Sequence, residues 1–232
     1  MKDTEIDKVE KIIGVVFDDK ALLKKAFTHR SYINENRGLG LSHNERLEFL
    51  GDAVLELAVT EFLFEKYPKR PEGDLTAFRA SLVNTQTLSA TSTKLGFNEF
   101  LLLSRGEAKD TGRARNYILA NTFESVVGAI QLDQGYASAQ KFIASNIFPL
   151  IDGILESGSW IDSKSNFQEK SQEMVSITPV YETISEEGPD HNKEFTVAVY
   201  LDEEEVAKGK GKSKQEGEQA AALEGLKEKG WL

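Results

Sequence analysis

The sequence predicts an all-α domain followed by a small α+β domain with the element order α-β-β-β-α. From about Asp3 to Leu150, apolar residues recur at steps of three and four residues, which is the period of a helix buried on one side. Beyond residue 165, part of the chain alternates apolar and polar residues, as strands do. Small and polar residues lie between the two regions. We therefore expect a helical domain over residues 3–152, a linker over 153–161 and a second domain over 162–232.

Within the first domain, segments that favour turns separate the helical patterns. These segments lie at residues 34–40, 67–71 and 108–113, where Gly, Pro, Asn and Asp are frequent. In the second domain we expect a helix near 167–175, strands at 180–184 and 195–201, a short strand around 205–208 and a final helix over about 213–229. A chain of 232 residues is long enough for a medium-sized domain and a small one.

The composition excludes some classes of site. The chain has no cysteine, so disulfides and thiolate zinc sites are impossible, and its three histidines lie far apart in the sequence. Any metal site must therefore use oxygen ligands. The first ten residues are rich in charge and no stretch approaches the roughly 18 apolar residues of a membrane span, so we expect no membrane contact and a cytoplasmic location. The net charge of −10 argues against binding nucleic acid unless basic residues are clustered.

Acidic residues gather on one face of a predicted helix. Glu45, Glu48 and Asp52 are spaced by three and four residues, which brings their side chains to one stripe. Because like charges repel, converging carboxylates favour a hard cation such as Mg²⁺. Two alternatives remain at this point: a solvated acidic stripe, and, for Glu45, a capping box with Ser42. A glycine at position 51 indicates a close contact with another helix.

A second helical segment, residues 117–132, is apolar on nearly every side and carries Asn121 and Glu124 one turn apart. A glutamate buried there would form an ion pair, have a raised pKa or bind a metal. The amide oxygen of Asn121 can ligate a hard ion, although a buried asparagine more often bonds to the backbone.

These residues lie in segments that resemble the ribonuclease III family. Residues 43–54 read His-Asn-Glu-Arg-Leu-Glu-Phe-Leu-Gly-Asp-Ala-Val, which is similar to the signature of that family. Similar family segments occur in the expected order at residues 26–32, 72–75, 79–83 and 118–130, so that the resemblance covers nearly the whole chain. It implies an all-α ribonuclease III endonuclease domain followed by a double-stranded RNA-binding domain.

The resemblance also implies residue roles. It makes Asp52 and Glu124 the main catalytic pair, and Glu48, Asn121 and Glu124 ligands of Mg²⁺, for which Mn²⁺ could substitute. Asp52 would bind the same ion directly or through water. Glu45 and Glu72 would have outer roles towards RNA or a second metal, although Glu72 is also explained as an acid at a helix N-terminus.

The implied reaction is hydrolysis of double-stranded RNA by metal-activated water, giving 5′-phosphate and 3′-hydroxyl ends, in the processing of ribosomal and messenger RNA. Family members form homodimers that leave short 3′ overhangs. Phe49 resembles the aromatic residue that enters the partner subunit; the alternative is an ordinary core phenylalanine.

One departure from the family pattern concerns the metal site. Asn121 stands where the family usually has aspartate, which should weaken metal binding and increase the Mg²⁺ requirement. The main alternative function is therefore a non-catalytic double-stranded RNA-binding protein whose site Asn121 has weakened. A more distant alternative is an acidic helical module that binds a protein partner.

The second domain contains a cluster of basic residues, which nucleic-acid binding requires in a chain of negative net charge. Residues 207–215 contain four lysines and no acid, at the expected N-terminus of the last helix. The resemblance implies contacts with duplex RNA from Ser165, Gln168, Gln172, His191, Lys212 and Lys214. The alternative is a solvated turn that the acidic residues 202–205 counterbalance. Nine lysines stand against sixteen acidic residues from Asp162 onward, so we expect a modest, salt-sensitive affinity.

Overall fold

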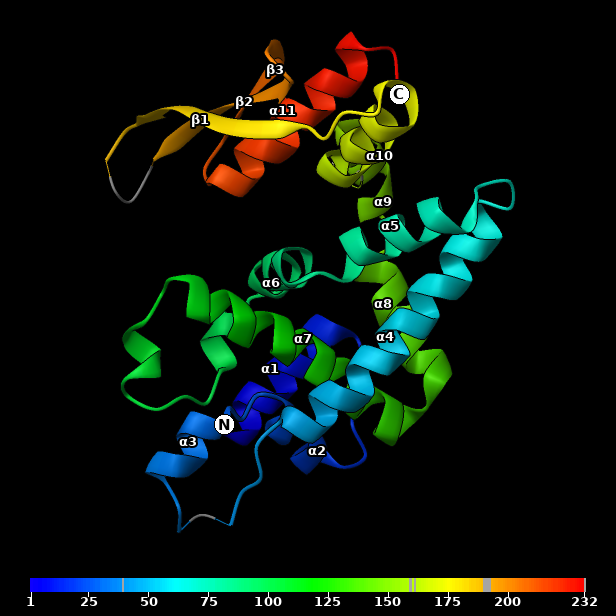
Figure 1. The fold of residues 1–232 in the computed structure, drawn as a ribbon. Helices are drawn as coiled ribbons and strands as arrows, with labels where there is room; N and C mark the ends of the chain where they lie inside the picture. Colours follow the sequence, from blue (N-terminus) through cyan, green and yellow to red (C-terminus); the bar gives the residue numbers. More distant parts are fainter. Residues whose placement is uncertain (39, 159, 161, 190–192, 232) are drawn as a thin grey trace. The chain divides into compact units, whose positions relative to one another are not determined.

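The computed structural model describes residues 1–38, 40–158, 160, 162–189 and 193–231. The chain divides into two compact units, Met1–Trp160 and Ile161–Leu232, which are described separately below (Figure 1).

The first unit is helical, which confirms the predicted fold class. Its helices are α1 (Asp3–Ile13), α2 (Lys20–Ala26), α3 (Arg30–Glu35), α4 (Glu45–Lys66), α5 (Glu72–Val83), α6 (Thr85–Lys94), α7 (Arg113–Gln134), α8 (Tyr136–Asn146) and α9 (Leu150–Ser157), with short 3-10 helices at Phe97–Phe100 and Glu107–Lys109. The ends of α3, α4 and the second 3-10 helix fall at the turn segments expected from the sequence.

Helix α7 lies at the centre of this unit. Phe123, Val127 and Ile130 are fully buried, as are most residues of α7 between positions 118 and 130. Helix α4 crosses α7 (Figure 1). Leu55, Val59 and other apolar residues of α4 are buried in the same core as those of α7. Burial of these side chains is the main force that holds the two helices together.

The linker expected at residues 153–161 is wrong in its first half. Helix α9 continues to Ser157, because Ile151, Ile154 and Leu155 provide an apolar face that packs on the core. Trp160 also belongs to the first unit, since its ring contacts Phe78 edge to face at 4.7 Å between centroids. Within the predicted linker, Ile154, Leu155 and Trp160 pack on the core although their sequence neighbours are small and polar.

The second unit has the predicted α-β-β-β-α order. It consists of α10 (Ser163–Val175), β1 (Val180–Glu187), β2 (Glu194–Leu201), β3 (Glu204–Gly211) and α11 (Lys214–Glu228), and its strands form an antiparallel sheet in the order β1-β2-β3. Both helices contribute to a core that contains Phe167, Val199 and Leu226.

Strand β3 is longer than predicted, which changes the place of two lysines. Lys208 and Lys210 both lie within β3, whereas the sequence analysis ended the strand at Lys208 and grouped both lysines with the cluster at the N-terminus of the last helix. A Cβ atom on Gly209, which lies between them, would come within 2.1 Å of the Ala221 backbone nitrogen, so glycine is required for α11 to lie against the strand. The alternation of glycine and lysine thus places the glycine against α11 and the lysines on the opposite face.

Candidate active site

The site is formed where α4 crosses α7. A Cβ atom on Gly51 of α4 would lie 1.7 Å from the carbonyl oxygen of Glu124, and one on Gly128 of α7 would lie 2.2 Å from the carbonyl oxygen of Leu47. The two backbones are therefore in direct contact, as the glycine at position 51 indicated. This crossing brings the acidic face of α4 to the segment of α7 that carries Asn121 and Glu124.

The electrostatics of the four predicted ligands show that they lie close together. Burial, together with the negative charges of Asp52 and Glu48, raises the pKa of Glu124 from 4.5 to about 8. Burial and the charge of Glu45 raise the pKa of Glu48, and a side-chain hydrogen bond with Asn121 partly opposes this rise. The structure thus brings Glu48, Asp52, Asn121 and Glu124 together. Glu48 is half-buried and faces α7, whereas Glu45 and Asp52 on the same stripe are exposed, so the solvated-stripe alternative is wrong for Glu48 alone.

The donor set fits a hard divalent cation. It consists of carboxylate oxygens and one amide oxygen, it has an excess of negative charge, and burial together with the charges of Asp52 and Glu48 raises the pKa of Glu124 to about 8. In the described ranges, no three carboxylate or imidazole side chains are already arranged as a metal site.

Glu45 and Glu72, the two acids with predicted outer roles, lie in different parts of the first unit. Glu45 is the first residue of α4 and lies 3.4 Å from Arg30 and 3.7 Å from His43. The capping-box alternative for Glu45 is wrong, because Asn44 rather than Ser42 occupies the cap position and its amide bonds to the Ala26 carbonyl instead.

Glu72 begins α5, as expected for an acid at a helix N-terminus. It lines a groove between α4 and α5 together with Phe64 and Arg79. Its charge is not among those that shift the pKa of Glu48 or Glu124. The described contacts therefore do not bring Glu72 into the cluster.

Phe49 is exposed over 81% of its surface, so the alternative of an ordinary core residue is wrong. It lies on the same face of α4 as Leu57 and Phe64, which are 50% and 72% exposed. Exposed apolar side chains aligned on one helix face are typical of a surface that contacts another protein.

Two exposed residues of α7 that the sequence analysis did not single out lie in line with Asn121. Arg113 and Tyr117 precede Asn121 at four-residue steps on α7, and the Arg113 guanidinium lies 5.8 Å from the centre of the Tyr117 ring. Both side chains are exposed. The regular spacing with Asn121 was the signal that could have identified them.

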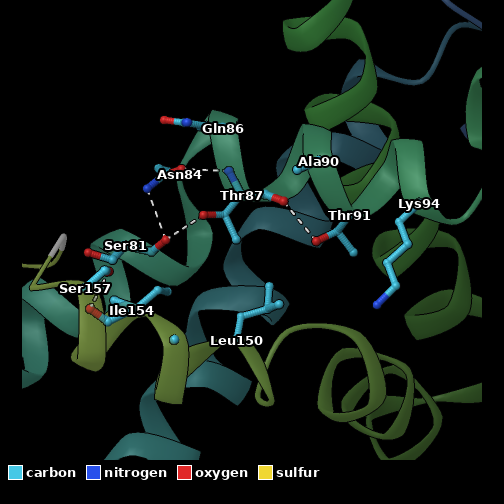
Figure 2. A pocket seen from close by; sticks show the side chains of 11 residues that line it. Ser81, Asn84, Gln86, Thr87, Ala90, Thr91, Lys94, Leu150, Ile154 and Ser157 are labelled. Carbon is cyan, nitrogen blue, oxygen red and sulfur yellow. Dashed lines mark hydrogen bonds between the residues drawn. The ribbon is translucent and has the colours of Figure 1, made fainter. Parts of the chain in front are cut away.

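A separate hollow of about 500 Å³ lies between α6 and α9 (Figure 2). Hydroxyl and amide side chains such as Asn84, Thr87 and Thr91 line much of it, and these three donate hydrogen bonds to nearby carbonyl groups (Figure 2). None of the acidic residues of the α4–α7 crossing lines this hollow.

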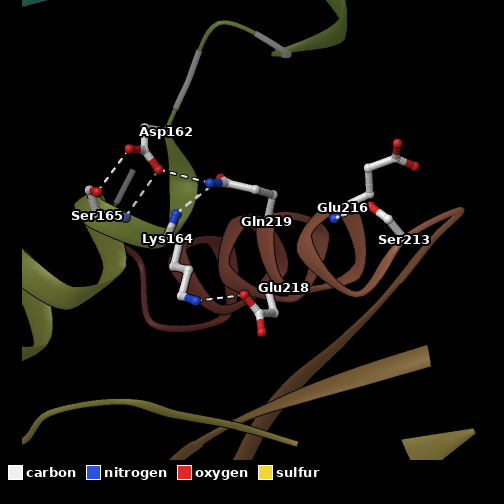
Figure 3. A network of polar contacts seen from close by, with 7 residues as sticks. All are labelled: Asp162, Lys164, Ser165, Ser213, Glu216, Glu218 and Gln219. Carbon is white, nitrogen blue, oxygen red and sulfur yellow. Dashed lines mark hydrogen bonds and ion pairs between the residues drawn. The ribbon is translucent and has the colours of Figure 1, made fainter. Parts of the chain in front are cut away.

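In the second unit, Ser165, Gln168 and Gln172 are exposed on one face of α10. The Ser165 hydroxyl donates a hydrogen bond to Asp162, the cap residue of α10, and the Gln219 amide of α11 also donates to Asp162 (Figure 3). These bonds join the start of α10 to α11 and orient the exposed face.

Lys212 and Lys214 are exposed at the N-terminus of α11. Ser213 caps this helix by accepting a bond from the Glu216 amide (Figure 3), and the Glu216 carboxylate accepts one from the Lys212 amide. The cap fixes the direction in which the two lysines leave the helix. His191 lies outside the described residues.

The predicted basic cluster is more strongly neutralised than the sequence indicated. Lys208 pairs with Glu205 at 3.0 Å, Lys210 with Glu194 at 2.6 Å and Lys214 with Glu186 at 3.2 Å. Of the expected counterweight at residues 202–205, only Glu205 pairs with the cluster in the described structure. The other two partners come from β1 and β2.

In the part of the chain that the structure describes, no helix has both the length and the apolar character needed to cross a bilayer.

Comparison with known proteins agrees with both units. A family model described as Ribonuclease-III-like matches residues 19–151, and one described as Double-stranded RNA binding motif matches residues 163–229. The chain is 47% identical to Ribonuclease 3 of Streptococcus gordonii over 90% of each protein. It is 46% identical to Ribonuclease 3 of Enterococcus faecalis over 92% of this chain and 93% of that protein.

The solved nuclease domain of ribonuclease III from Campylobacter jejuni, a structure that describes flexibility in a region involved in dimer formation, is similar with a TM-score of 0.55 and 40% identity. The match covers 62% of this chain and 99% of that domain. Both units, the crossing of α4 and α7 and these relatives lead to one conclusion: the chain belongs to the ribonuclease III family.

Proposed function

We propose that this protein is a divalent-metal-dependent endoribonuclease that hydrolyses double-stranded RNA. The observation that best supports the proposal is the α4–α7 crossing, which brings Glu48 and Asp52 next to Asn121 and Glu124 in a half-buried, electronegative site. The exposed face of α10 and the lysines of α11 are the surfaces that we assign to the RNA duplex.

The four residues of the crossing are the proposed ligands of Mg²⁺, with Mn²⁺ as a substitute. When bound, the ion would lower the pKa of a water molecule and stabilise charge on the phosphate oxygens. Asp52 and Glu124 orient the attacking water, which displaces the 3′ oxygen and leaves a 5′-phosphate and a 3′-hydroxyl. Glu45 and Glu72 remain candidates for weaker, outer contacts.

We also propose that the protein acts as a cytoplasmic homodimer in the processing of ribosomal and messenger RNA. The apolar face of α4 that carries Phe49 supports this assembly, because its exposed aromatic and aliphatic side chains would be covered by a partner. Two sites on opposite strands would leave short 3′ overhangs.

Incubation of long duplex RNA with Mg²⁺ tests the function. The wild-type protein should release short products that carry 5′-phosphates, whereas Glu124→Gln should bind the duplex without cutting it. Binding without any cleavage by the wild type would favour the non-catalytic alternative. Loss of both binding and cleavage would contradict the proposal as a whole.

Asn121→Asp should reduce the Mg²⁺ concentration needed for half-maximal cleavage by roughly tenfold, because a charged oxygen replaces a neutral one among the ligands. Titration of Mg²⁺ in the cleavage assay measures this. Asn116→Asp is the matched control, since it adds the same charge to an exposed position of α7. Equal Mg²⁺ dependence of the wild type and Asn121→Asp would contradict the assignment of Asn121.

The affinity for duplex RNA should be modest and should fall roughly 100-fold between about 50 and 200 mM salt, because a few lysines on an acidic unit make all the phosphate contacts. Binding of labelled duplex to the Glu124→Gln protein measures this slope without cleavage. A curve that stays flat over the same range would contradict an electrostatic mode of binding.

A further inference from the structure

Glu186, near the end of β1, holds two lysines of the second unit. One of its carboxylate oxygens lies 3.2 Å from Lys214 Nζ at the start of α11, and the other lies 3.7 Å from Lys193 Nζ at the start of β2. We propose that Glu186 occupies the place of an RNA phosphate at Lys214 and competes with the duplex for this lysine. The inference rests on the proposed RNA-binding function and identifies the residue that limits its affinity.

The chemistry of the site is suited to exchange between a carboxylate and a phosphate. Both are anions with oxygen acceptors, and both are stabilised by an ammonium group at the positive end of a helix dipole. Lys214 is the first residue of α11, and its Nζ also lies 6.0 Å from the centre of the Phe195 ring. Glu186 faces Phe195 across the β1–β2 ladder, so that the sheet itself holds the carboxylate against Lys214.

The pair is open to solvent and can therefore separate when RNA arrives. The side chains of Lys214 and Glu186 are 60% and 39% exposed. Exposed ion pairs of this kind are weak, so a phosphate that brings further contacts can displace the carboxylate. The displaced Glu186 then remains beside the phosphate and repels it, which lowers the affinity for the duplex.

Lys212, two residues earlier, provides a contrast. Within the described residues its side chain pairs with no carboxylate, although its backbone amide bonds to Glu216. The two lysines assigned to the RNA therefore differ in how readily they bind a phosphate. Lys212 can bind one directly, whereas Lys214 must first break its ion pair with Glu186.

Glu186→Gln tests the competition, because it removes the charge and keeps the shape. The experiment uses the full-length protein with Glu124→Gln, so that a labelled blunt RNA duplex is bound but not cut. Glu224→Gln is the matched control: it removes the same charge from a similarly exposed glutamate that pairs with Lys227 at 2.7 Å, about 15 Å further along α11 than Lys214. We expect Glu186→Gln to bind about fivefold more tightly and Glu224→Gln to change affinity less than about twofold.

A second arm uses Lys214→Gln to test whether the increase in duplex affinity depends on this lysine. In the Lys214→Gln background, Glu186→Gln should not increase the affinity for the duplex, because the ammonium group for which carboxylate and phosphate compete is absent. Equal gains from Glu186→Gln and Glu224→Gln would overturn the inference, because the effect would then reflect net charge alone. A full gain that persists without Lys214 would overturn it as well. Absence of duplex binding by every protein, including the background protein, would overturn the proposed function and the inference with it.

Discussion

Gly51→Ala is expected to lower the free energy of unfolding by about 3–5 kcal/mol and the midpoint of thermal unfolding by roughly 10 °C. The new methyl group would lie 1.7 Å from the carbonyl oxygen of Glu124, and this oxygen belongs to the backbone of a central helix that cannot move aside. The two helices must separate by about 1 Å or more, which places Glu48 and Asp52 out of register with Asn121 and Glu124. Cleavage should therefore also fall, by roughly 100-fold.

Gly153→Ala is the matched control for this substitution. Gly153 lies within α9, and a Cβ atom there would meet nothing within 4 Å. The same change should stabilise the protein by about 0.5–1 kcal/mol, because alanine loses less backbone entropy in a helix. Thermal unfolding and cleavage assays of the two variants distinguish them. If Gly51→Ala unfolded like the wild type, α4 and α7 would not be in backbone contact.

Glu124→Gln is expected to reduce cleavage by roughly 10²–10³-fold while duplex binding is retained. The amide keeps the size of the side chain but removes the charge of one proposed metal ligand. Glu124 lies on α7 in the first unit, whereas the residues assigned to duplex binding lie on α10 and α11 in the second. Single-turnover cleavage and binding of the same duplex measure the two effects separately.

The same substitution should stabilise the metal-free protein at pH 8. Folding raises the pKa of Glu124 from 4.5 to about 8, so the folded state binds this proton more tightly than the unfolded state. The stability contributed by the protonated group is present below pH 4.5 and is lost as the pH rises towards 8. Glutamine does not titrate, so the free energy of unfolding of Glu124→Gln should exceed that of the wild type by about 4 kcal/mol at pH 8.

Thermal unfolding in the presence of a chelator, at about pH 5 and pH 8, tests this dependence. The difference between the two proteins should be small at the lower pH and large at the higher one. Addition of Mg²⁺ at pH 8 should stabilise the wild type more than Glu124→Gln, because binding to the folded state shifts the equilibrium by mass action. A difference that is independent of pH would show that Glu124 does not titrate in this range.

Local patterns were sufficient for much of the site. The spacing of Glu48 and Asp52 placed them on one helix face, and Gly51 between them indicated a close contact, because both properties depend only on the helix repeat. The segment around Asn121 and Glu124 was expected to be buried because its apolar residues cover nearly every side of the helix.

Local sequence patterns did not predict where one helix begins and where one strand ends. Ser42 matched a capping box, yet Asn44 begins the helix, since its amide bonds to Ala26 of a distant segment. The predicted strand ended at Lys208, but pairing with β2 extends it through Lys210 to Gly211. Such choices depend on contacts between segments that are remote in the sequence.

The sequence by itself determined the two units, their element order and the oxygen-only chemistry of any metal site, and its resemblance to the family implied the four ligands that we propose. Only the tertiary structure decided that α4 and α7 touch backbone to backbone, that Glu124 has a strongly raised pKa and that Glu186 holds Lys214. The reason is physical: helix and strand periods are properties of neighbouring residues, whereas burial and electrostatic coupling arise from groups that meet only after folding.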